Sequence, residues 1–243
     1  MSRRRKSVDL TDSQFKELVS KVNQKQEKIK PSVGFKNKKQ QLYYNTIMEN
    51  QITVATGPAG TAKTFIACYA GLQLLSSGEI DKIIITKPSV EIGKTQGFLP
   101  GDLEEKMEPF TRSIMDCISN IVGEAQANNL VYSKKQIEVI PLQMMRGLTL
   151  DNSFVICDEA QNCDYTQLKA LLTRLGEDCI LSINGDKSQT DLKDNSGLPH
   201  AIKVLESVDG VGFVEFTYDD IVRSGIVKDI IISYDRYEKT EEV

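Results

Sequence analysis

The sequence lacks the features that mark membrane-spanning, secreted and zinc-binding proteins. No uninterrupted apolar run among its 243 residues approaches the length of a membrane span, and the N-terminus has no apolar signal-peptide core. There is one histidine, His200, and the five cysteines have no C-x-x-C spacing. That pattern argues against a zinc site and favours reduced thiols. We therefore expect a cytoplasmic protein that has no membrane partner.

Charge is unevenly distributed along the chain. The 30 Lys/Arg and 34 Asp/Glu residues give a formal net charge of −4, yet residues 1–40 contain twelve basic and four acidic side chains. The remaining residues are correspondingly acidic. A basic arm on an acidic body can contact a nucleic-acid backbone or the acidic surface of a neighbouring subunit, and it can also be a solvated tail. Composition alone leaves these alternatives open.

Short apolar runs alternate with helix-forming segments through most of the chain. Continuous apolar strands that alternate with helices indicate an α/β fold whose central, mostly parallel sheet is covered by helices on both faces. We expect a basic arm over residues 1–34, with a marginal helix at 9–30, and one domain over 35–243. Strands are expected at 52–56, 82–86, 137–140, 154–157, 179–184 and 211–217, and helices at 37–48, 63–76, 102–121, 164–175, 198–207 and 225–237.

Residues 57–64, Gly-Pro-Ala-Gly-Thr-Ala-Lys-Thr, have the pattern of a phosphate-binding loop between a strand and a helix. Backbone N–H groups and the positive end of the helix dipole make such a loop an anion cradle. We expect Lys63 to contact β/γ-phosphate oxygens and the Thr64 hydroxyl to hold Mg²⁺. The alternative is a strand–turn–helix with a chance lysine. The expected nucleotide contacts are Gly57, Pro58, Ala59, Gly60, Thr61, Ala62, Lys63 and Thr64.

One position departs from the usual loop. Ala62 stands where the pattern has its second glycine. An alanine is tolerated there if its φ is negative, but its methyl group narrows the approach of the phosphates. The substitution therefore bears on affinity and rate rather than on the fold.

An acidic pair follows the buried-strand pattern of residues 154–157. An aspartate at the carboxyl end of a parallel strand lies on the same edge of the sheet as the phosphate loop. We expect Asp158 to hold Mg²⁺ through water, and Glu159 to orient the attacking water or take its proton. The alternative is a solvated helix start.

A third polar cluster follows the strand expected at 179–184. Gln189 is the candidate for sensing the γ-phosphate, with Asn184 and Asp186 in support, and the alternative is a Gly-Asp turn with an exposed glutamine. Hydrolysis also needs the transition-state charge stabilised, typically by an arginine supplied in cis or in trans. Each arginine considered can instead be a salt-bridged surface residue. The candidates are Arg146, Arg174 and Arg223.

Taken together, nine blocks of the sequence resemble the PhoH family of ATPases over roughly residues 35–238. The resemblance implies a RecA-like fold related to the cores of superfamily one helicases, ATP hydrolysis in a ring-shaped, hexameric assembly, and a role in RNA metabolism. The blocks are Gly57–Thr64, Ile85–Glu91, Gly97–Leu103, Arg146–Leu150, Phe154–Asn162, Leu172–Gly176, Gly185–Leu192, Ser196–His200 and Asp220–Arg223.

The resemblance also assigns roles to two further segments. It implies that Gln40 reads adenine, and that Thr86–Pro88 is a strand-end motif facing nucleic acid. Ala62 replaces the family's usual glycine. The chain is short and we expect no appended RNA-binding or nuclease domain, so it resembles the minimal members carried by large bacteriophages. If it is phage-encoded, we expect it in the host cytoplasm.

The favoured hypothesis is Mg²⁺-dependent ATP hydrolysis coupled to binding or remodelling of single-stranded RNA or DNA, with RNA favoured. The chain is too short for a second RecA-like domain, so a neighbouring copy in a ring is the natural source of an arginine, Arg174 or Arg223. The alternative is a weakly hydrolysing scaffold in which ATP holds the ring and recruits a partner. A small-molecule kinase is less favoured because nothing resembles an acceptor-binding lid.

Overall fold

The computed structural model describes residues 31–241, apart from residue 32, residues 89–102, residue 146, residues 188–191 and residues 193–194. The basic arm with its expected helix at 9–30 lies outside the described residues. Two candidates for the site, Arg146 and Gln189, also lie outside them. The expected domain boundary after residue 34 therefore stays a prediction.

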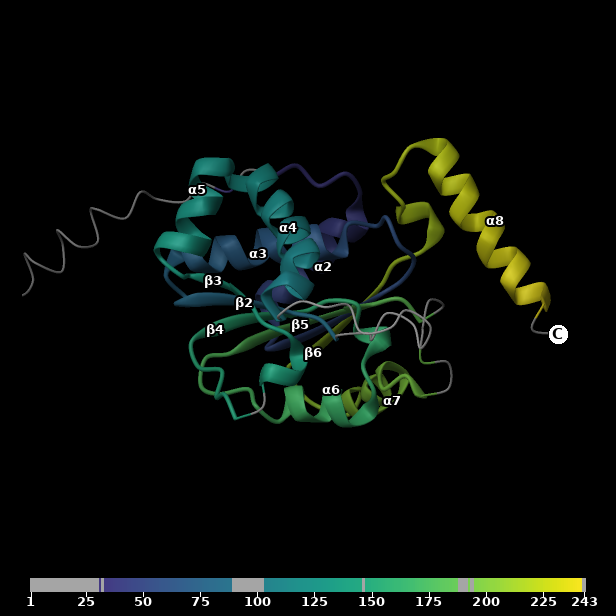
Figure 1. The fold of residues 1–243 in the computed structure, drawn as a ribbon. Coiled ribbons are helices and arrows are strands. Elements are labelled where there is room, and N and C mark those ends of the chain that lie inside the picture. The colour runs from purple at the N-terminus through teal and green to yellow at the C-terminus, as the bar shows by residue number, and fades with distance from the viewer. Residues whose placement is uncertain are drawn as a thin grey trace, which may run out of the picture.

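Within the described residues, a six-stranded sheet forms the middle layer of the fold (Figure 1). The strand order is β3-β2-β4-β5-β1-β6, and every neighbouring pair is parallel. The expected α/β class with a parallel sheet is confirmed. The strands are β1 (Ile52–Thr56), β2 (Lys82–Thr86), β3 (Ile137–Val139), β4 (Ser153–Cys157), β5 (Ile180–Gly185) and β6 (Val211–Glu215).

Helices cover both faces of this sheet (Figure 1). On one face lie α2 (Lys38–Glu49), α3 (Lys63–Ser77), α4 (Leu103–Val122) and the short α5 (Glu124–Asn128), which a π-helical turn at Asn129–Ser133 continues. On the other face lie α6 (Tyr165–Leu172) and α7 (Leu198–Leu205).

Strand β4 shows how the two layers of core are separated. Phe154 and Ile156 belong to the hydrophobic cluster under α2, α3 and α4, whereas Val155 and Cys157 belong to the cluster under α6 and α7. Successive side chains of a strand point to opposite faces, so an apolar residue at every position is what a doubly covered strand requires.

The topology brings the motifs to one edge of the sheet. Strand β1 leads into the phosphate loop, β4 ends before Asp158, and β5 lies between them. All three strands are parallel, so their carboxyl ends meet at that edge. Two backbone hydrogen bonds continue the sheet there: Gly57 N donates to Gly185 O at 3.2 Å, and Asp158 N donates to Thr86 O at 2.8 Å.

The last helix, α8 (Gly225–Glu241), projects away from the three layers (Figure 1). Several of its apolar side chains are exposed, among them Ile226, Ile230, Tyr234 and Tyr237. None of the helices in the described part of the chain has the length and apolar character needed to cross a membrane.

Candidate active site

The loop after β1 wraps around the start of α3. Gly57 and Gly60 have φ angles of 136° and 82°, which L-residues rarely adopt. Helix α3 begins at Lys63 without a side-chain cap. Its first N–H groups are therefore left for an anion, and the helix dipole favours negative charge at the same point.

Ala62 does not have the negative φ angle at which an alanine would be tolerated in this loop. Its φ is 68° and its ψ is 30°, in the left-handed region rather than at negative φ. An L-residue in that conformation costs about 1–2 kcal/mol, a cost that glycine avoids. The loop therefore holds backbone strain at the residue immediately before Lys63.

The ammonium of Lys63 lies against the loop itself. Its Nζ donates hydrogen bonds to Gly57 O at 2.6 Å and to Pro58 O at 3.0 Å, and lies 3.4 Å from Thr61 Oγ1. Burial lowers the pKa of Lys63, whereas nearby carboxylates, with that of Asp186 first, oppose this shift. A flexible cation is thus held where a bound anion could compete with the loop carbonyls for it.

Thr64 and Asp158 are joined directly. Thr64 Oγ1 lies 2.9 Å from Asp158 Oδ1 and 3.0 Å from Oδ2. Burial, followed by the neighbouring charge of Glu159, raises the pKa of Asp158 to about 6, and the hydrogen bond from Thr64 opposes that shift.

This hydroxyl–carboxylate pair fits Mg²⁺, which prefers hard oxygen ligands and usually keeps several waters. In the part of the chain that the structure describes, no cluster of three His, Cys, Asp or Glu residues could hold a metal ion by itself. The remaining ligands would therefore be water and phosphate oxygens.

Glu159 follows Asp158 and is exposed, with a left-handed backbone (φ 54°, ψ 38°). Non-glycine residues in such conformations cluster at functional sites. The buried Gln161 donates from Nε2 to Glu159 Oε2 at 2.7 Å. Sequence reasoning assigned no role to Gln161, although its position two residues after the candidate base was a usable signal.

Asn184, at the end of β5, presents a polar atom to the site. Tyr43 Oη donates to Asn184 Oδ1 at 2.5 Å. The Nδ2 atom of Asn184 is buried and has no hydrogen-bond partner among the described residues. Asn184 lines the cavity, so this amide is a donor placed beside the phosphate loop.

These groups surround one cavity of about 1030 Å³. Its volume is near the upper end of the range of about 300–1,000 Å³ typical of ligand pockets. The structure brings Lys63 and Asp158 to one edge of the sheet as expected, while their roles stay predictions. Gly57, Pro58 and Thr61 lie behind the lining residues and hold Lys63. Among the expected site residues, the lining includes Gln40, Ala59, Gly60, Ala62, Lys63, Thr64, Asp158, Glu159, Asn184, Asp186 and Arg223.

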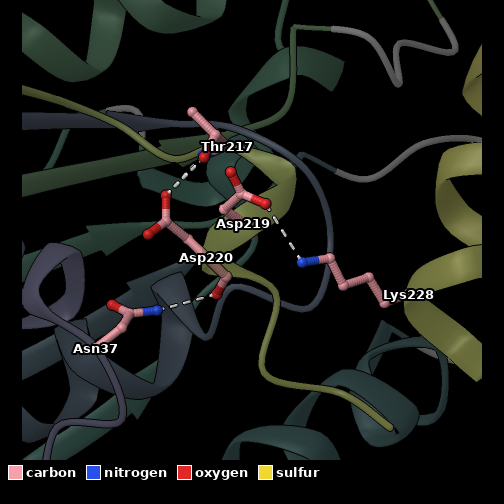
Figure 2. A network of polar contacts seen from close by, with 5 residues as sticks. All are labelled: Asn37, Thr217, Asp219, Asp220 and Lys228. Atoms are coloured by element: carbon pink, nitrogen blue, oxygen red, sulfur yellow. Dashed lines mark hydrogen bonds and ion pairs between the residues drawn. The ribbon is translucent and has the colours of Figure 1, made fainter. Parts of the chain in front are cut away.

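A polar network fixes the segment that carries Arg223 (Figure 2). Asn37 Nδ2 donates to Asp220 O at 3.2 Å, and Asp220 Oδ2 accepts from Thr217 N at 2.8 Å and from Thr217 Oγ1 at 3.1 Å. Lys228 Nζ lies 3.5 Å from Asp219 Oδ1, which ties the first turn of α8 to the same segment. The segment preceding α2, the segment after β6 and the first turn of α8 therefore meet in this network.

The two described candidate arginines occupy different places. Val222 N donates to Gly60 O at 2.9 Å, and a Cβ atom at Gly60 would lie 2.9 Å from Arg223 Cγ. Arg223 thus lines the cavity of its own chain. It was one of two arginines considered for a neighbour's site, and that role stays a prediction. Arg174 lines a separate cavity of about 280 Å³ with Gln143 and Asp164, so it does not line the cavity beside the phosphate loop of its own chain. A role for Arg174 in a neighbouring subunit stays a prediction.

Comparisons with known proteins give the family of this chain. Residues 32–235 match the model of a family described as PhoH-like protein. The chain belongs to the PhoH-like protein family. The resemblance drawn from the sequence blocks is confirmed.

Curated PhoH-like proteins are similar over most of this chain. It is 42% identical over 210 residues to a PhoH-like protein of Synechocystis sp., which covers 86% of this chain and 64% of that protein. It is 41% identical over 207 residues to a PhoH-like protein of Bacillus subtilis (84% and 65%) and 37% identical over 205 residues to Protein PhoH of Escherichia coli (82% and 57%). The chain thus spans less than two thirds of the length of these relatives.

Among solved structures, a likeness covers 83% of this chain and 34% of the DUF1998 helicase MrfA in its DNA-bound crystal form. The TM-score is 0.44 and the sequence identity is 10%.

The PhoH resemblance gave Gln40 the role of reading adenine. In the structure Gln40 lines the cavity and connects the segment before α2 to the phosphate loop. The buried Gln40 accepts from Lys36 N through Oε1 at 2.9 Å and donates from Nε2 to Thr61 O at 3.3 Å. An amide has a further donor and a further acceptor site. Its contact with adenine therefore stays a prediction beside an observed role in bracing the loop.

Lys87 was expected, from the same resemblance, to belong to a motif facing nucleic acid. Its side chain lines the nucleotide cavity, and Nζ lies 4.6 Å from the centre of the Phe110 ring. The charge of Lys87 also lowers the pKa of Asp158, as a minor opponent of burial. A second lysine therefore lies at the candidate site, and its position directly after β2, the neighbour of β4, was the signal in the sequence.

Proposed function

We propose that this PhoH-like protein is a Mg²⁺-dependent ATPase. The observation that carries the proposal is the meeting of Thr64 Oγ1 with both oxygens of Asp158, at 2.9 and 3.0 Å, beside Lys63 and Glu159 in one cavity. A phosphate-binding loop, an oxygen-ligand pair and a carboxylate next to it are the parts that hydrolysis of a nucleoside triphosphate requires.

Each group has a task in this reaction. The loop N–H groups and Lys63 bind phosphate oxygens, and Thr64 with Asp158 provides the oxygen ligands for Mg²⁺. When bound, Mg²⁺ neutralises charge on the phosphates. Glu159 orients the attacking water and accepts its proton at a carboxylate oxygen.

Two further groups complete the cavity. The buried Nδ2 atom of Asn184 supplies a donor at the end of β5. Arg223 brings a permanent positive charge to the rim, where charge on the transferred phosphoryl group must be balanced.

Phosphate release from ATP, measured with and without Mg²⁺, tests the proposal. Glu159→Gln should lower turnover by about 10²–10⁴-fold, the range for a positioned base, with little loss of ATP affinity. Unchanged turnover in this variant would remove Glu159 from the mechanism. A wild-type protein that binds no adenine nucleotide would contradict the proposal as a whole.

The proposed working form is a ring of identical subunits, and the family resemblance favours six. Two observations support an assembly: Arg174 lies outside its own nucleotide cavity, and α8 exposes Ile230 and Tyr234. Turnover per subunit should rise with protein concentration as the ring forms, and sedimentation velocity follows the assembly. Turnover that does not change while oligomers form would separate hydrolysis from the ring.

Coupling to single-stranded nucleic acid, with RNA favoured, is the third part of the proposal. Its support is the PhoH resemblance together with the basic residues 3–6 of the sequence. Single-stranded RNA should stimulate turnover more than single-stranded DNA does, and the stimulation should weaken as salt rises. Replacing residues 3–6 together with alanine should reduce stimulation without changing basal turnover. Equal rates with and without either polymer would count against coupling.

A weakly hydrolysing scaffold is the second candidate, and the strained backbone of Ala62 favours it. In that case ATP holds the assembly and hydrolysis is incidental. The Ala62→Gly variant separates the two candidates. A large gain in turnover with unchanged assembly would indicate that the wild-type protein is a slowed enzyme that serves as a scaffold. Turnover already high in the wild type, with no gain on substitution, favours the ATPase.

A further inference from the structure

Gln161 connects the candidate base to the neighbouring strand. It belongs to the 3-10 turn Ala160–Asn162 that follows Glu159, and its side chain is 3% exposed. Its Nε2 atom donates to Glu159 Oε2 at 2.7 Å, while its Oε1 atom accepts from Asp186 N at 3.0 Å. One side chain thus spans from the carboxylate to the residue immediately after β5.

The orientation of this amide follows from its neighbours. A backbone N–H group can only donate, so the atom that faces Asp186 N must be the oxygen of the Gln161 amide. The nitrogen then faces Glu159, whose carboxylate can only accept. Both ends of the amide are therefore matched, and exchanging them would put a donor against a donor.

The residues around Gln161 restrict the position of its side chain. Gly185 gives the amide room, because a Cβ atom there would lie 3.1 Å from Gln161 Oε1 and 2.5 Å from Leu198 Cδ2. Ala160 and Cys163, on either side of Gln161, are fully buried in the core under α6 and α7. The amide consequently projects from a fixed anchor, whereas Glu159 is exposed.

We propose that Gln161 is a positioning residue for Glu159, which it holds at a fixed position relative to the carboxyl end of β5. This inference rests on the proposed ATPase function. In the proposed reaction Gln161 acts through Glu159, whose carboxylate it contacts. An exposed carboxylate without this tie samples several rotamers, and only some of them face the attacking water.

Two substitutions separate positioning from simple bracing. Gln161→Met removes both hydrogen bonds while keeping a flexible side chain of similar length. Gln161→Glu is nearly isosteric and keeps an acceptor for Asp186 N, but it presents a carboxylate to Glu159 in place of a donor. Both should lower kcat by about 10- to 100-fold and leave the affinity for a fluorescent ATP analogue within about threefold.

A matched control is available on α3. Gln73 also bridges two segments, donating from Nε2 to Tyr69 Oη at 2.9 Å and to Pro31 O at 3.4 Å, and it does not line the nucleotide cavity. Gln73→Met should lower the melting temperature by an amount similar to that for Gln161→Met while leaving kcat unchanged. A fall in kcat for both variants would indicate a general loss of stability and would overturn the inference.

A double-mutant cycle gives the decisive measurement. If Gln161 acts through Glu159, then Gln161→Glu and Gln161→Met should lower single-turnover rates in the wild-type background but change them little in the Glu159→Gln background. Equal losses in both backgrounds, or full kcat in Gln161→Glu, overturn the inference while leaving the ATPase proposal intact. A wild-type protein with no turnover overturns the ATPase proposal and this inference with it.

Discussion

Thr64 and Asp158, which we call the floor of the cavity, bond to each other: Thr64 lies in the first turn of α3 and Asp158 directly follows β4. At the rim, by contrast, Arg223 extends from an exposed segment. The parallel sheet holds this floor, because the loop that leads to Thr64 follows β1, Asp158 follows β4, and both strands have a neighbour on each side. The rim depends on a small network that includes Asn37 and Asp220. The residues proposed to contact phosphate and Mg²⁺ are therefore held by the sheet, whereas the arginine proposed to balance charge depends on segments that meet from far apart in the sequence.

The largest effect is expected from a substitution of Asp158 at the floor of the cavity. Asp158→Asn should reduce Mg²⁺-dependent turnover by more than about 10³-fold, because it removes a ligand from a metal whose stabilisation of the transition state is several kcal/mol. The unliganded protein should melt at the same or a higher temperature, since burial of the Asp158 carboxylate, which raises its pKa, is unfavourable to folding. Steady-state kinetics and calorimetry on one preparation check both halves. A large loss of stability would show that Asp158 holds the fold.

The next effect separates the two described candidate arginines, Arg223 at the rim of the cavity and Arg174 outside it. Arg223→Ala and Arg174→Ala should each lower turnover by about 10³-fold if each balances transition-state charge. Their placement predicts different behaviour in mixed assemblies. Combining Arg174→Ala with Lys63→Ala subunits should restore part of the activity, because an intact loop can receive Arg174 from its neighbour.

The matched mixture for the other arginine is the control. Arg223→Ala combined with Lys63→Ala should stay inactive, since Arg223 lines the cavity of its own chain. Recovery in this mixture, measured as phosphate release after subunit exchange, would mean that Arg223 acts on a neighbouring subunit. No recovery in either mixture would place both arginines in cis or outside the reaction.

A smaller effect tests the connection between rim and loop at Gln40. Gln40→Ala leaves Thr61 O without its buried donor and Lys36 N without its acceptor, so we expect a loss of about 1–3 kcal/mol in the free energy of unfolding. If the side chain also reads adenine, the affinity for ATP should fall more than that for inorganic triphosphate. Denaturant unfolding and competition binding measure the two effects. Equal losses for both ligands would restrict Gln40 to bracing the loop.

The smallest effect concerns backbone strain at Ala62 in the phosphate loop. Ala62→Gly relieves about 1–2 kcal/mol of left-handed strain but adds roughly 0.5–1 kcal/mol of chain entropy to the unfolded state. We therefore expect a net stabilisation of at most about 1.5 kcal/mol, visible as a small rise in melting temperature. Loss of stability would indicate that Ala62 gains packing contacts that outweigh its backbone cost.

The strands were the best-predicted part of the fold. The run expected at 82–86 is β2 itself, and the run at 154–157 lies within Ser153–Cys157. Strands buried on both faces carry an apolar residue at every position, so their sequence signal is continuous. By contrast, α5 at Glu124–Asn128 and the π-helical turn after it were not predicted. Five mostly polar residues are too short to show a helical period.

The site was predicted as residues but not as geometry. Lys63, Thr64, Asp158 and Glu159 are recognisable because loop chemistry and strand ends are local in sequence. The left-handed φ of Ala62 depends on how the loop closes onto α3, so the pattern alone could not give it. Likewise, no local pattern indicates that Gln161 reaches Asp186, because that contact crosses from one strand end to another.

The sequence by itself determined the class of chemistry: a phosphate loop after one apolar strand and an acidic pair after another, which parallel strands bring to the same edge. Only the tertiary structure decided which charges share that edge. It put Arg223 and Lys87 on the cavity, left Arg174 outside it, and tied Glu159 to the end of β5 through Gln161. The physical reason is range: backbone patterns act over a few residues, whereas the position of a side chain at a rim is set by segments that become neighbours only when the chain folds.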